Sequence, residues 1–96
     1  MHVLVIYDIS DDGLRFKISE LCKDFGLLRI QKSAFLGPLT NSRKRELVSR
    51  IRSLISYYGS NDDNVQVFTL DSFSLRSRII IGKVVVEESE GVLLYV

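Results

Sequence analysis

The stretch that decides the fold is Val3-Leu4-Val5-Ile6-Tyr7-Asp8-Ile9, an apolar run with a single carboxylate close to its end. The run predicts a strand over residues 2–9, buried at the centre of a sheet. Burying an unpaired charge is costly, so we expect the Asp8 carboxylate at the end of the strand. There a metal, a cationic side chain or solvent can stabilise its charge. Functional residues often occupy such strand ends, but a carboxylate that caps the next helix is an equally good interpretation.

Two helices are predicted on the C-terminal side of this strand. The first follows the possible N-caps Ser10-Asp11-Asp12 and stops at Gly26, and its apolar residues recur at helical spacing from Leu14 to Phe25. The second follows the possible N-caps Thr40-Asn41-Ser42 and stops at Gly59. Its Tyr57-Tyr58 pair is expected to pack into the core or anchor the helix end rather than stack on bases.

The remaining segments favour strands. Residues 27–37 alternate in polarity and form one strand, or two if the segment bends, before Gly37-Pro38 ends it. Further strands are predicted at residues 65–70, 78–81, 83–87 and 92–96, with an irregular piece at 72–77. These elements predict one α+β domain over residues 1–96, a ferredoxin-like βαββαβ sandwich with extra C-terminal strands. An apolar last strand with no place in its own sheet is expected to pair with the sheet edge of another subunit.

Composition excludes several classes of protein. The 96 residues include 13 basic and 12 acidic side chains, so the whole chain is not a polycation. The single Cys22 excludes an internal disulfide, and no stretch approaches transmembrane length. We expect a cytoplasmic protein with no membrane partner. Zinc-ligand spacing, a glycine-rich phosphate loop and a dinucleotide fingerprint are absent, and His2, the one histidine, is interpreted as incidental.

Basic side chains gather in the middle of the chain. Between residues 29 and 52 the only acid is Glu46, and the cations are Arg29, Lys32, Arg43, Lys44, Arg45, Arg50 and Arg52. Three of them crowd the start of the second helix, where positive charge opposes the helix dipole. Phosphate is the usual ligand of such a patch, although a solvated basic helix face explains it equally well.

Asp8 by itself is a poor Mg²⁺ site, because this ion commonly takes one or two carboxylates and keeps several waters. A twofold dimer supplies a second carboxylate if it brings two copies of Asp8 together. Asp11 and Asp12 are explained more simply as helix caps.

The residues Tyr7-Asp8-Ile9, Arg15, Lys17 and Arg29-x-Gln31-x-Ser33-x-Phe35-x-Gly37 resemble the small CRISPR-associated endoribonuclease family, the smaller of the two near-universal proteins of spacer acquisition. The resemblance is specific over residues 3–41. It implies a ferredoxin-like homodimer in which Asp8 and the partner's Asp8 share a catalytic Mg²⁺. It further implies that the nucleic-acid cleft is lined or supported by Tyr7, Arg15, Lys17, Arg29, Ser33 and Phe35.

Three functions follow from the resemblance and the charge pattern. The first is a Mg²⁺-dependent endonuclease of antiviral defence that cuts single-stranded RNA, double-stranded DNA or both. The second is a non-catalytic dimer that bridges copies of the CRISPR integrase and holds a DNA duplex on Arg43, Lys44 and Arg45. The third is a toxin-like ribonuclease with the same fold. The first assigns Asp8 a chemical role, whereas the second assigns it none.

Overall fold

A computed structural model of the chain describes residues 1–83, 85–87 and 93–95. Two helices alternate with the first four strands in the predicted βαββαβ order, and a short helix and two short strands follow. The elements are β1 (His2–Asp8), α1 (Asp12–Asp24), β2 (Leu28–Gln31), β3 (Ala34–Pro38), α2 (Asn41–Tyr58), β4 (Asn64–Leu70), α3 (Ser72–Arg76), β5 (Val85–Glu87) and β6 (Leu93–Tyr95).

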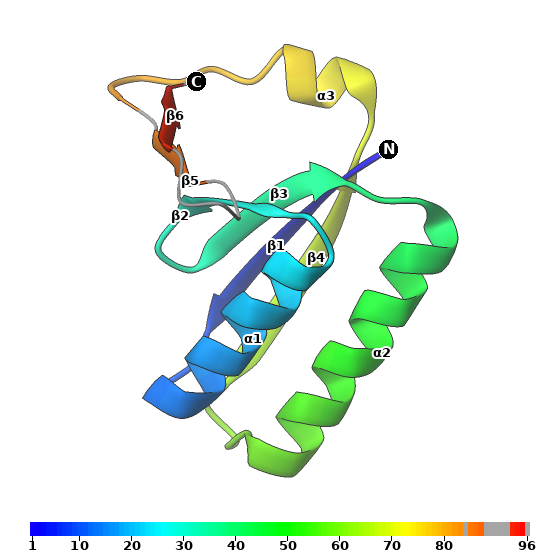
Figure 1. Cartoon of the computed structure of the whole chain (residues 1–96), viewed down its shortest axis with the longest axis vertical. Helices are drawn as coiled ribbons and strands as arrows, with labels where there is room; N and C mark the ends of the chain where they lie inside the picture. Colours follow the sequence, from blue (N-terminus) through cyan, green and yellow to red (C-terminus); the bar gives the residue numbers. More distant parts are fainter. Residues whose placement is uncertain (84, 88–92, 96) are drawn as a thin grey trace.

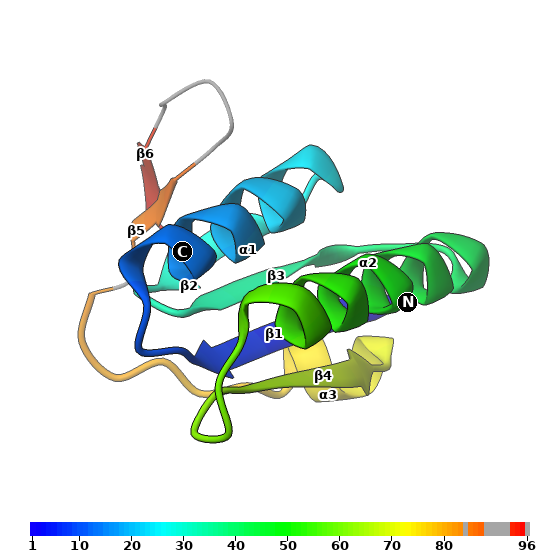
Figure 2. The ribbon, with the colours of Figure 1, turned by 90° about the horizontal axis from the view of Figure 1, so that it is seen from below.

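The strands form one sheet in the order β4-β1-β3-β2-β5-β6, and every neighbouring pair is antiparallel (Figure 1). β1 and β2 therefore run in the same direction on either side of β3, as a crossover through α1 requires. Both long helices cover the same face of the sheet (Figure 2). The ferredoxin-like α+β fold is confirmed.

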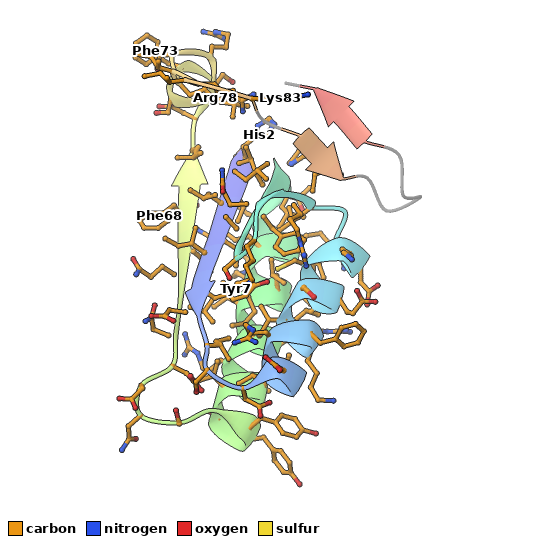
Figure 3. The ribbon with its side chains drawn as sticks, turned by 90° about the vertical axis from the view of Figure 1, so that its left-hand side faces the viewer. His2, Tyr7, Phe68, Phe73, Arg78 and Lys83 are labelled. Atoms are coloured by element: carbon orange, nitrogen blue, oxygen red, sulfur yellow. The ribbon has the colours of Figure 1, made fainter. Side chains whose placement is uncertain are left out.

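Alternation along β1 divides the molecule into a core and an open sheet face. Val3, Val5 and Tyr7 are buried beneath the helices, where they pack with apolar residues of α1 and α2 such as Ile18 and Leu47. The intervening residues of β1 point to the other face of the sheet, because neighbouring side chains of a strand alternate. Figure 3 shows both directions: Tyr7 lies on the helix side, and Phe68 of β4 projects away from the helices.

Both long helices begin and end where the capping residues predict. The Asp11 carboxylate accepts a hydrogen bond from the Leu14 amide at 2.8 Å, and the Thr40 hydroxyl accepts one from the Arg43 amide at 3.2 Å. Gly26 ends α1 with φ +85°, a left-handed conformation that glycine adopts without steric cost.

Residues 27–37 bend into two strands rather than one. β2 and β3 form a hairpin whose register shifts between Arg29 and Gln31, and Lys32 and Ser33 make the turn. Within this hairpin Leu28 lies beside Leu36, which in turn lies beside Leu4 of β1.

Two predictions for the region after β4 are wrong. The piece expected to be irregular contains α3, which Asp71 caps by accepting a hydrogen bond from the Ser74 amide at 2.7 Å. The strand expected at residues 78–81 is absent, because no neighbouring strand pairs with this segment. Ile79 and Ile81 remain 84% and 95% exposed.

The C-terminal strands take places in the chain's own sheet. β5 pairs with β2, and β6 pairs with β5, so the expectation that the last strand needs another subunit's edge is wrong for this chain. Lys83, which the prediction included, lies outside β5, and residues 84, 92 and 96 of the predicted strands lie outside the described residues. None of the helices described is both long and apolar enough to cross a membrane.

Cys22 provides a direct test of the core. Its side chain lies on the buried face of α1, and burial raises the pKa of the thiol to about 12, although nearby Arg29 opposes this shift. Thiol reagents attack the thiolate, so we expect no labelling of the native protein at pH 8 and stoichiometric labelling in denaturant, as mass spectrometry would measure. Rapid labelling under native conditions would show that this part of the core is open.

Candidate functional site

Asp8 is the last residue of β1 and lies on the open face of the sheet, beside Asn64 of β4. Its side chain is exposed. Within the described residues no hydrogen bond or ion pair engages its carboxylate, so it does not cap α1; Asp11 does. The carboxylate is free to bind a cation.

Arg15 stabilises the loop that follows Asp8. One guanidinium nitrogen donates hydrogen bonds to the carbonyls of Ile9 at 2.9 Å and Ser10 at 3.2 Å, and the other forms an ion pair with Asp12. Charge-assisted hydrogen bonds of this kind fix the loop. Arg15 therefore positions the strand end that carries Asp8, and its donors are largely occupied.

A second set of hydrogen bonds connects the loops at this end of the molecule. The Asp63 carboxylate, in the loop before β4, accepts hydrogen bonds from the amide of Ser10 at 3.0 Å and from the amide of Ser60 at 2.8 Å. These hydrogen bonds hold the pKa of Asp63 below its ordinary value, and the bond from the Ser10 amide makes the largest contribution. The link joins the loop after Asp8 to the loop after α2.

Tyr7, Arg29 and Phe35 form one cluster inside the fold. The rings of Tyr7 and Phe35 stack with centroids 6.4 Å apart, and the Arg29 guanidinium lies 5.1 Å from the Phe35 ring. Phe35 is fully buried and Tyr7 nearly so, and burial raises the pKa of the tyrosine hydroxyl. Within the described residues the buried Nε of Arg29 has no hydrogen-bond partner. The aromatic rings support the sheet and do not line an open cleft.

The side chains of Ser33 and Lys17 make no contact with these rings among the described residues. Ser33 is in the β2–β3 turn, and its carbonyl accepts a hydrogen bond from the Tyr7 amide at 3.0 Å. Lys17 is exposed on α1, with its ammonium 5.0 Å from the ring centroid of Tyr58.

The three cations at the start of α2 differ in their surroundings. Arg43 pairs with Glu46 at 2.9 Å and stacks 4.0 Å from the centroid of Phe25. Lys44 donates a hydrogen bond to the Thr69 hydroxyl on β4 at 2.5 Å. Arg45 has no such partner among the described residues. Arg45 is thus the one of these three whose guanidinium is free to meet a ligand.

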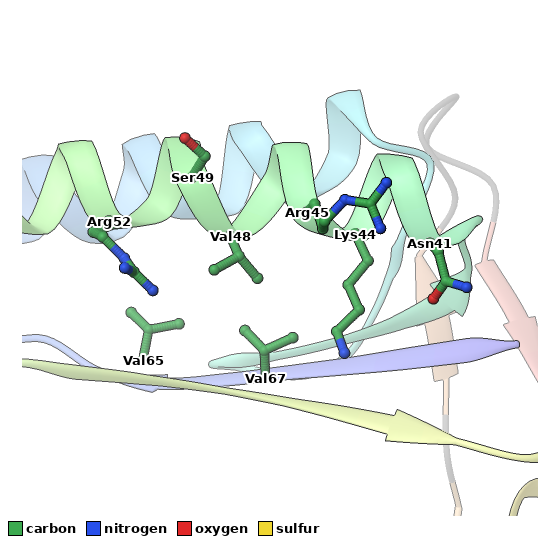
Figure 4. A pocket seen from close by; sticks show the side chains of 8 residues that line it. All are labelled: Asn41, Lys44, Arg45, Val48, Ser49, Arg52, Val65 and Val67. Atoms are coloured by element: carbon green, nitrogen blue, oxygen red, sulfur yellow. The ribbon is translucent and has the colours of Figure 1, made fainter.

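Arg45 lines a groove of about 720 Å³ between α2 and β4 (Figure 4). Its floor is apolar and its rim on α2 carries cations, and it is lined by Asn41, Lys44, Arg45, Val48, Ser49, Arg52, Val65 and Val67. Arg52 lies seven residues after Arg45 and therefore faces the same way on the helix. It also lacks a partner among the described residues.

These placements separate the predicted site residues into distinct groups. Asp8, Arg15 and Lys17 gather where β1 ends and α1 begins, whereas α2 starts at the opposite end of the sheet (Figure 1). One chain therefore does not gather Asp8 and the basic triplet into a single cleft.

A single chain also lacks a complete metal site. Within the described residues no three His, Cys, Asp or Glu side chains gather closely enough to hold a metal ion. One free, exposed carboxylate does fit a Mg²⁺ that keeps several waters and takes its second carboxylate from another copy.

Sequence reasoning missed two contributors, Asn64 beside Asp8 and Asp63, which ties the two loops together. It included Arg52 in the basic patch but did not single it out with Arg45, whose groove it lines. A signal existed for Arg52, because its spacing from Arg45 fits one helix face. The other two depend on the register of β4 against β1, which no local pattern sets.

The fold and the exposed strand-end carboxylate define a ferredoxin-like α+β protein with a surface suited to cations and phosphates. The family described as CRISPR associated protein Cas2 matches residues 1–77, and the chain belongs to that family. The CRISPR-associated endoribonuclease Cas2 of Korarchaeum cryptofilum is 40% identical over 83 residues, which are 86% of each chain. The resemblance inferred from the motif at residues 7–37 is confirmed.

Two further matches come from a fusion protein and from a complex whose names also contain Cas1. A CRISPR-associated endonuclease Cas1/endonuclease Cas2 fusion of Thermoproteus tenax is 35% identical over 71 residues, 74% of this chain and 26% of the fusion. A chain in a solved partial Cas6-RT-Cas1–Cas2 complex is 28% identical, with a TM-score of 0.70 over 83% of this chain and 89% of that one.

The link between Asp63 and Ser10 predicts a pH dependence. Because the pKa of Asp63 is lowered from its ordinary value of 3.8, its contribution to stability is present above that pH and is lost as the pH falls through the folded value. We expect Asp63→Asn to lower the thermal unfolding midpoint at neutral pH and to flatten its fall in acid. Asp62→Asn is the matched control, since the Asp62 side chain has no hydrogen bond among the described residues. Equal acid profiles for the two variants would contradict the assignment.

Proposed function

We propose that the protein is a homodimeric, Mg²⁺-dependent endonuclease that cuts single-stranded RNA, double-stranded DNA or both during CRISPR spacer acquisition. The observation that carries the proposal is the free, exposed carboxylate of Asp8 at the end of β1. The names of the matching relatives, which call them endoribonucleases, support the reaction type.

The open sheet face supports the dimer. Cross-strand neighbours place four apolar side chains in a row across it, namely Leu28, Leu36, Leu4 and Phe68. Phe68 is 43% exposed, so this face leaves apolar surface to be covered. An isologous interface repeats each contact, and Asp8 lies on the same face, so twofold packing of this face would bring two copies of Asp8 toward one another.

A second pair of features fits the same dimer. In the described part of the chain β4 pairs only with β1, so its other edge is open. The segment with exposed Ile79 and Ile81 has no strand partner either. An unpaired strand edge is a template for another strand. Pairing of this segment with the β4 edge of the partner would therefore give hydrogen-bond partners to the backbone of the segment and of the open edge.

The residues of this chain have defined roles in such a site. Asp8 and the partner's Asp8 would hold the metal, and Arg15 would keep the strand end in place through its bonds to Ile9 and Ser10. A Mg²⁺ held by these carboxylates would supply an activated water and would offset charge on the phosphate. No histidine lies in this strand end or loop, so we expect slow turnover.

Asp8→Asn tests the nuclease. The substitution keeps the shape of the side chain but removes its charge, so we expect cleavage of labelled RNA or DNA to fall at least about 100-fold. Asp62→Asn is the control, and thermal unfolding and light scattering would verify that all proteins are folded dimers. Activity in EDTA gives the metal requirement. Undiminished cutting by Asp8→Asn would place the activity elsewhere or in a contaminant.

The alternative function is a non-catalytic scaffold that holds a DNA duplex and docks the Cas1 integrase. Arg45 and Arg52 support it, because both are free of partners in the described chain and line one groove. The Cas1/Cas2 fusion and the complex that contains Cas1 and Cas2 support the partner. The family match favours these two functions over a toxin-like ribonuclease.

Charge reversal of the groove tests the scaffold. We expect Arg45→Glu with Arg52→Glu to weaken duplex binding strongly and to reduce the salt slope of log Kd by about 1 per lost phosphate contact. Arg43→Glu is the comparison, because Arg43 already pairs with Glu46 and should contribute less. Fluorescence anisotropy at several salt concentrations measures both. An unchanged salt slope in the double variant would exclude the groove from DNA binding.

A further inference from the structure

Tyr57 and Tyr58, the last two residues of α2, form an exposed aromatic pair. Their side chains are 81% and 49% exposed, and the rings meet edge to face with centroids 4.6 Å apart. The expectation that both pack into the core is therefore wrong, whereas Tyr58 does contact Lys17 of the neighbouring helix. Two exposed rings in contact form one continuous aromatic surface that is available to a ligand.

Lys17 completes the cluster from the neighbouring helix. α1 and α2 lie side by side and run in opposite directions, which brings the start of α1 to the end of α2 (Figure 1). The Lys17 ammonium lies 5.0 Å from the Tyr58 ring centroid, and the lysine side chain is itself exposed. An aromatic surface and a cation therefore lie next to each other on the outside of the molecule.

The cluster occupies the same end of the molecule as Asp8. Tyr58 directly precedes Gly59 and the loop in which Asp63 bonds to the amide of Ser10, two residues after Asp8. The acids at this end are partly engaged: Asp63 accepts two backbone amides, and Asp12 pairs with Arg15. The carboxylates of Asp8, Asp62 and Asp63 lie at this end too, so ring stacking, and not net charge, has to supply the binding of a single strand that passes Lys17 and the exposed rings.

We propose that Tyr57, Tyr58 and Lys17 form a stacking platform for the unpaired bases of a single-stranded nucleic acid whose backbone also passes Asp8. Every base has a π-face, so the platform binds single strands with little sequence preference, and Lys17 provides charge for a neighbouring phosphate. Bases inside a duplex are already stacked, so the platform favours single strands over duplexes. The proposal rests on the nucleic-acid function proposed above and adds the form of the ligand.

Binding to a labelled single-stranded oligonucleotide tests the platform. We would measure it in the Asp8→Asn background, which prevents cutting. Tyr57→Ala with Tyr58→Ala is expected to raise the Kd for single strands about tenfold or more and that for a duplex by less than about twofold. Tyr57→Phe with Tyr58→Phe keeps both rings and is expected to restore single-strand binding. Phe73→Ala, which removes a 70% exposed ring on α3, is the control for loss of any surface aromatic group.

Intrinsic fluorescence provides a second readout. The chain has four tyrosines and no tryptophan, so stacking of bases on Tyr57 and Tyr58 should quench tyrosine emission when single strands bind. The quench should vanish in the double phenylalanine variant although binding persists. Unchanged single-strand binding by the double alanine variant, or an equal loss for duplex, would overturn the proposal.

The outcomes for platform and nuclease are separable. If proteins with Asp8 intact cut nucleic acid while the double alanine variant binds single strands normally, the platform is wrong and the nuclease stands. If wild type cuts nothing but the alanine variant loses single-strand binding, the nuclease is wrong and the platform stands.

Discussion

The structure depends on the pairing of β1 along both of its edges, to β3 on one side and β4 on the other. This pairing satisfies the backbone polar groups of a strand whose alternate residues are buried, a necessity in the apolar core. It also fixes which side chains of β1 face the helices. Val3, Val5 and Tyr7 enter the core, and the alternate positions, ending in Asp8, face outward. Because the side-chain period of a strand is two residues, a shift of one position would bury Asp8 and expose the core residues.

The same register explains why the candidate site is built from separate parts. It places Asn64 beside Asp8 and allows Asp63 to bond to Ser10, so one end of the sheet carries the carboxylate and its supporting loops. The cationic groove lies along β4 toward the start of α2, near Thr69 at the other end of that strand. A long polyanion is able to contact both ends of a molecule of this size, whereas a small ligand is not. This separation suits a protein that handles nucleic acid and has little catalytic machinery of its own.

Whether a charged side chain of this protein is available to a ligand depends on its partners within the fold. The sequence presents the three cations at residues 43–45 as equivalent, but the structure engages Arg43 with Glu46 and Phe25 and Lys44 with Thr69. Arg45 and Arg52 keep their donors free among the described residues. Likewise Phe35 of the family motif is fully buried and supports Arg29, whereas Tyr57 and Tyr58, expected inside, are exposed. Burial and pairing, more than residue type, decide which side chains are available to a ligand.

The sequence by itself determined the elements whose signals are local: the buried strand of residues 2–9, both long helices with the capping segments among which Asp11 and Thr40 lie, and the glycines that end them. It also determined the family, through the motif between Tyr7 and Gly37. Only the tertiary structure decided the partners of Arg43 and Lys44, the exposure of the Tyr57-Tyr58 pair, and the placement of the C-terminal strands beside β2. The physical reason is distance along the chain. Helical period and capping depend on residues within about four positions, whereas the bond from Ser10 to Asp63 joins residues 53 positions apart and exists only once the sheet has formed.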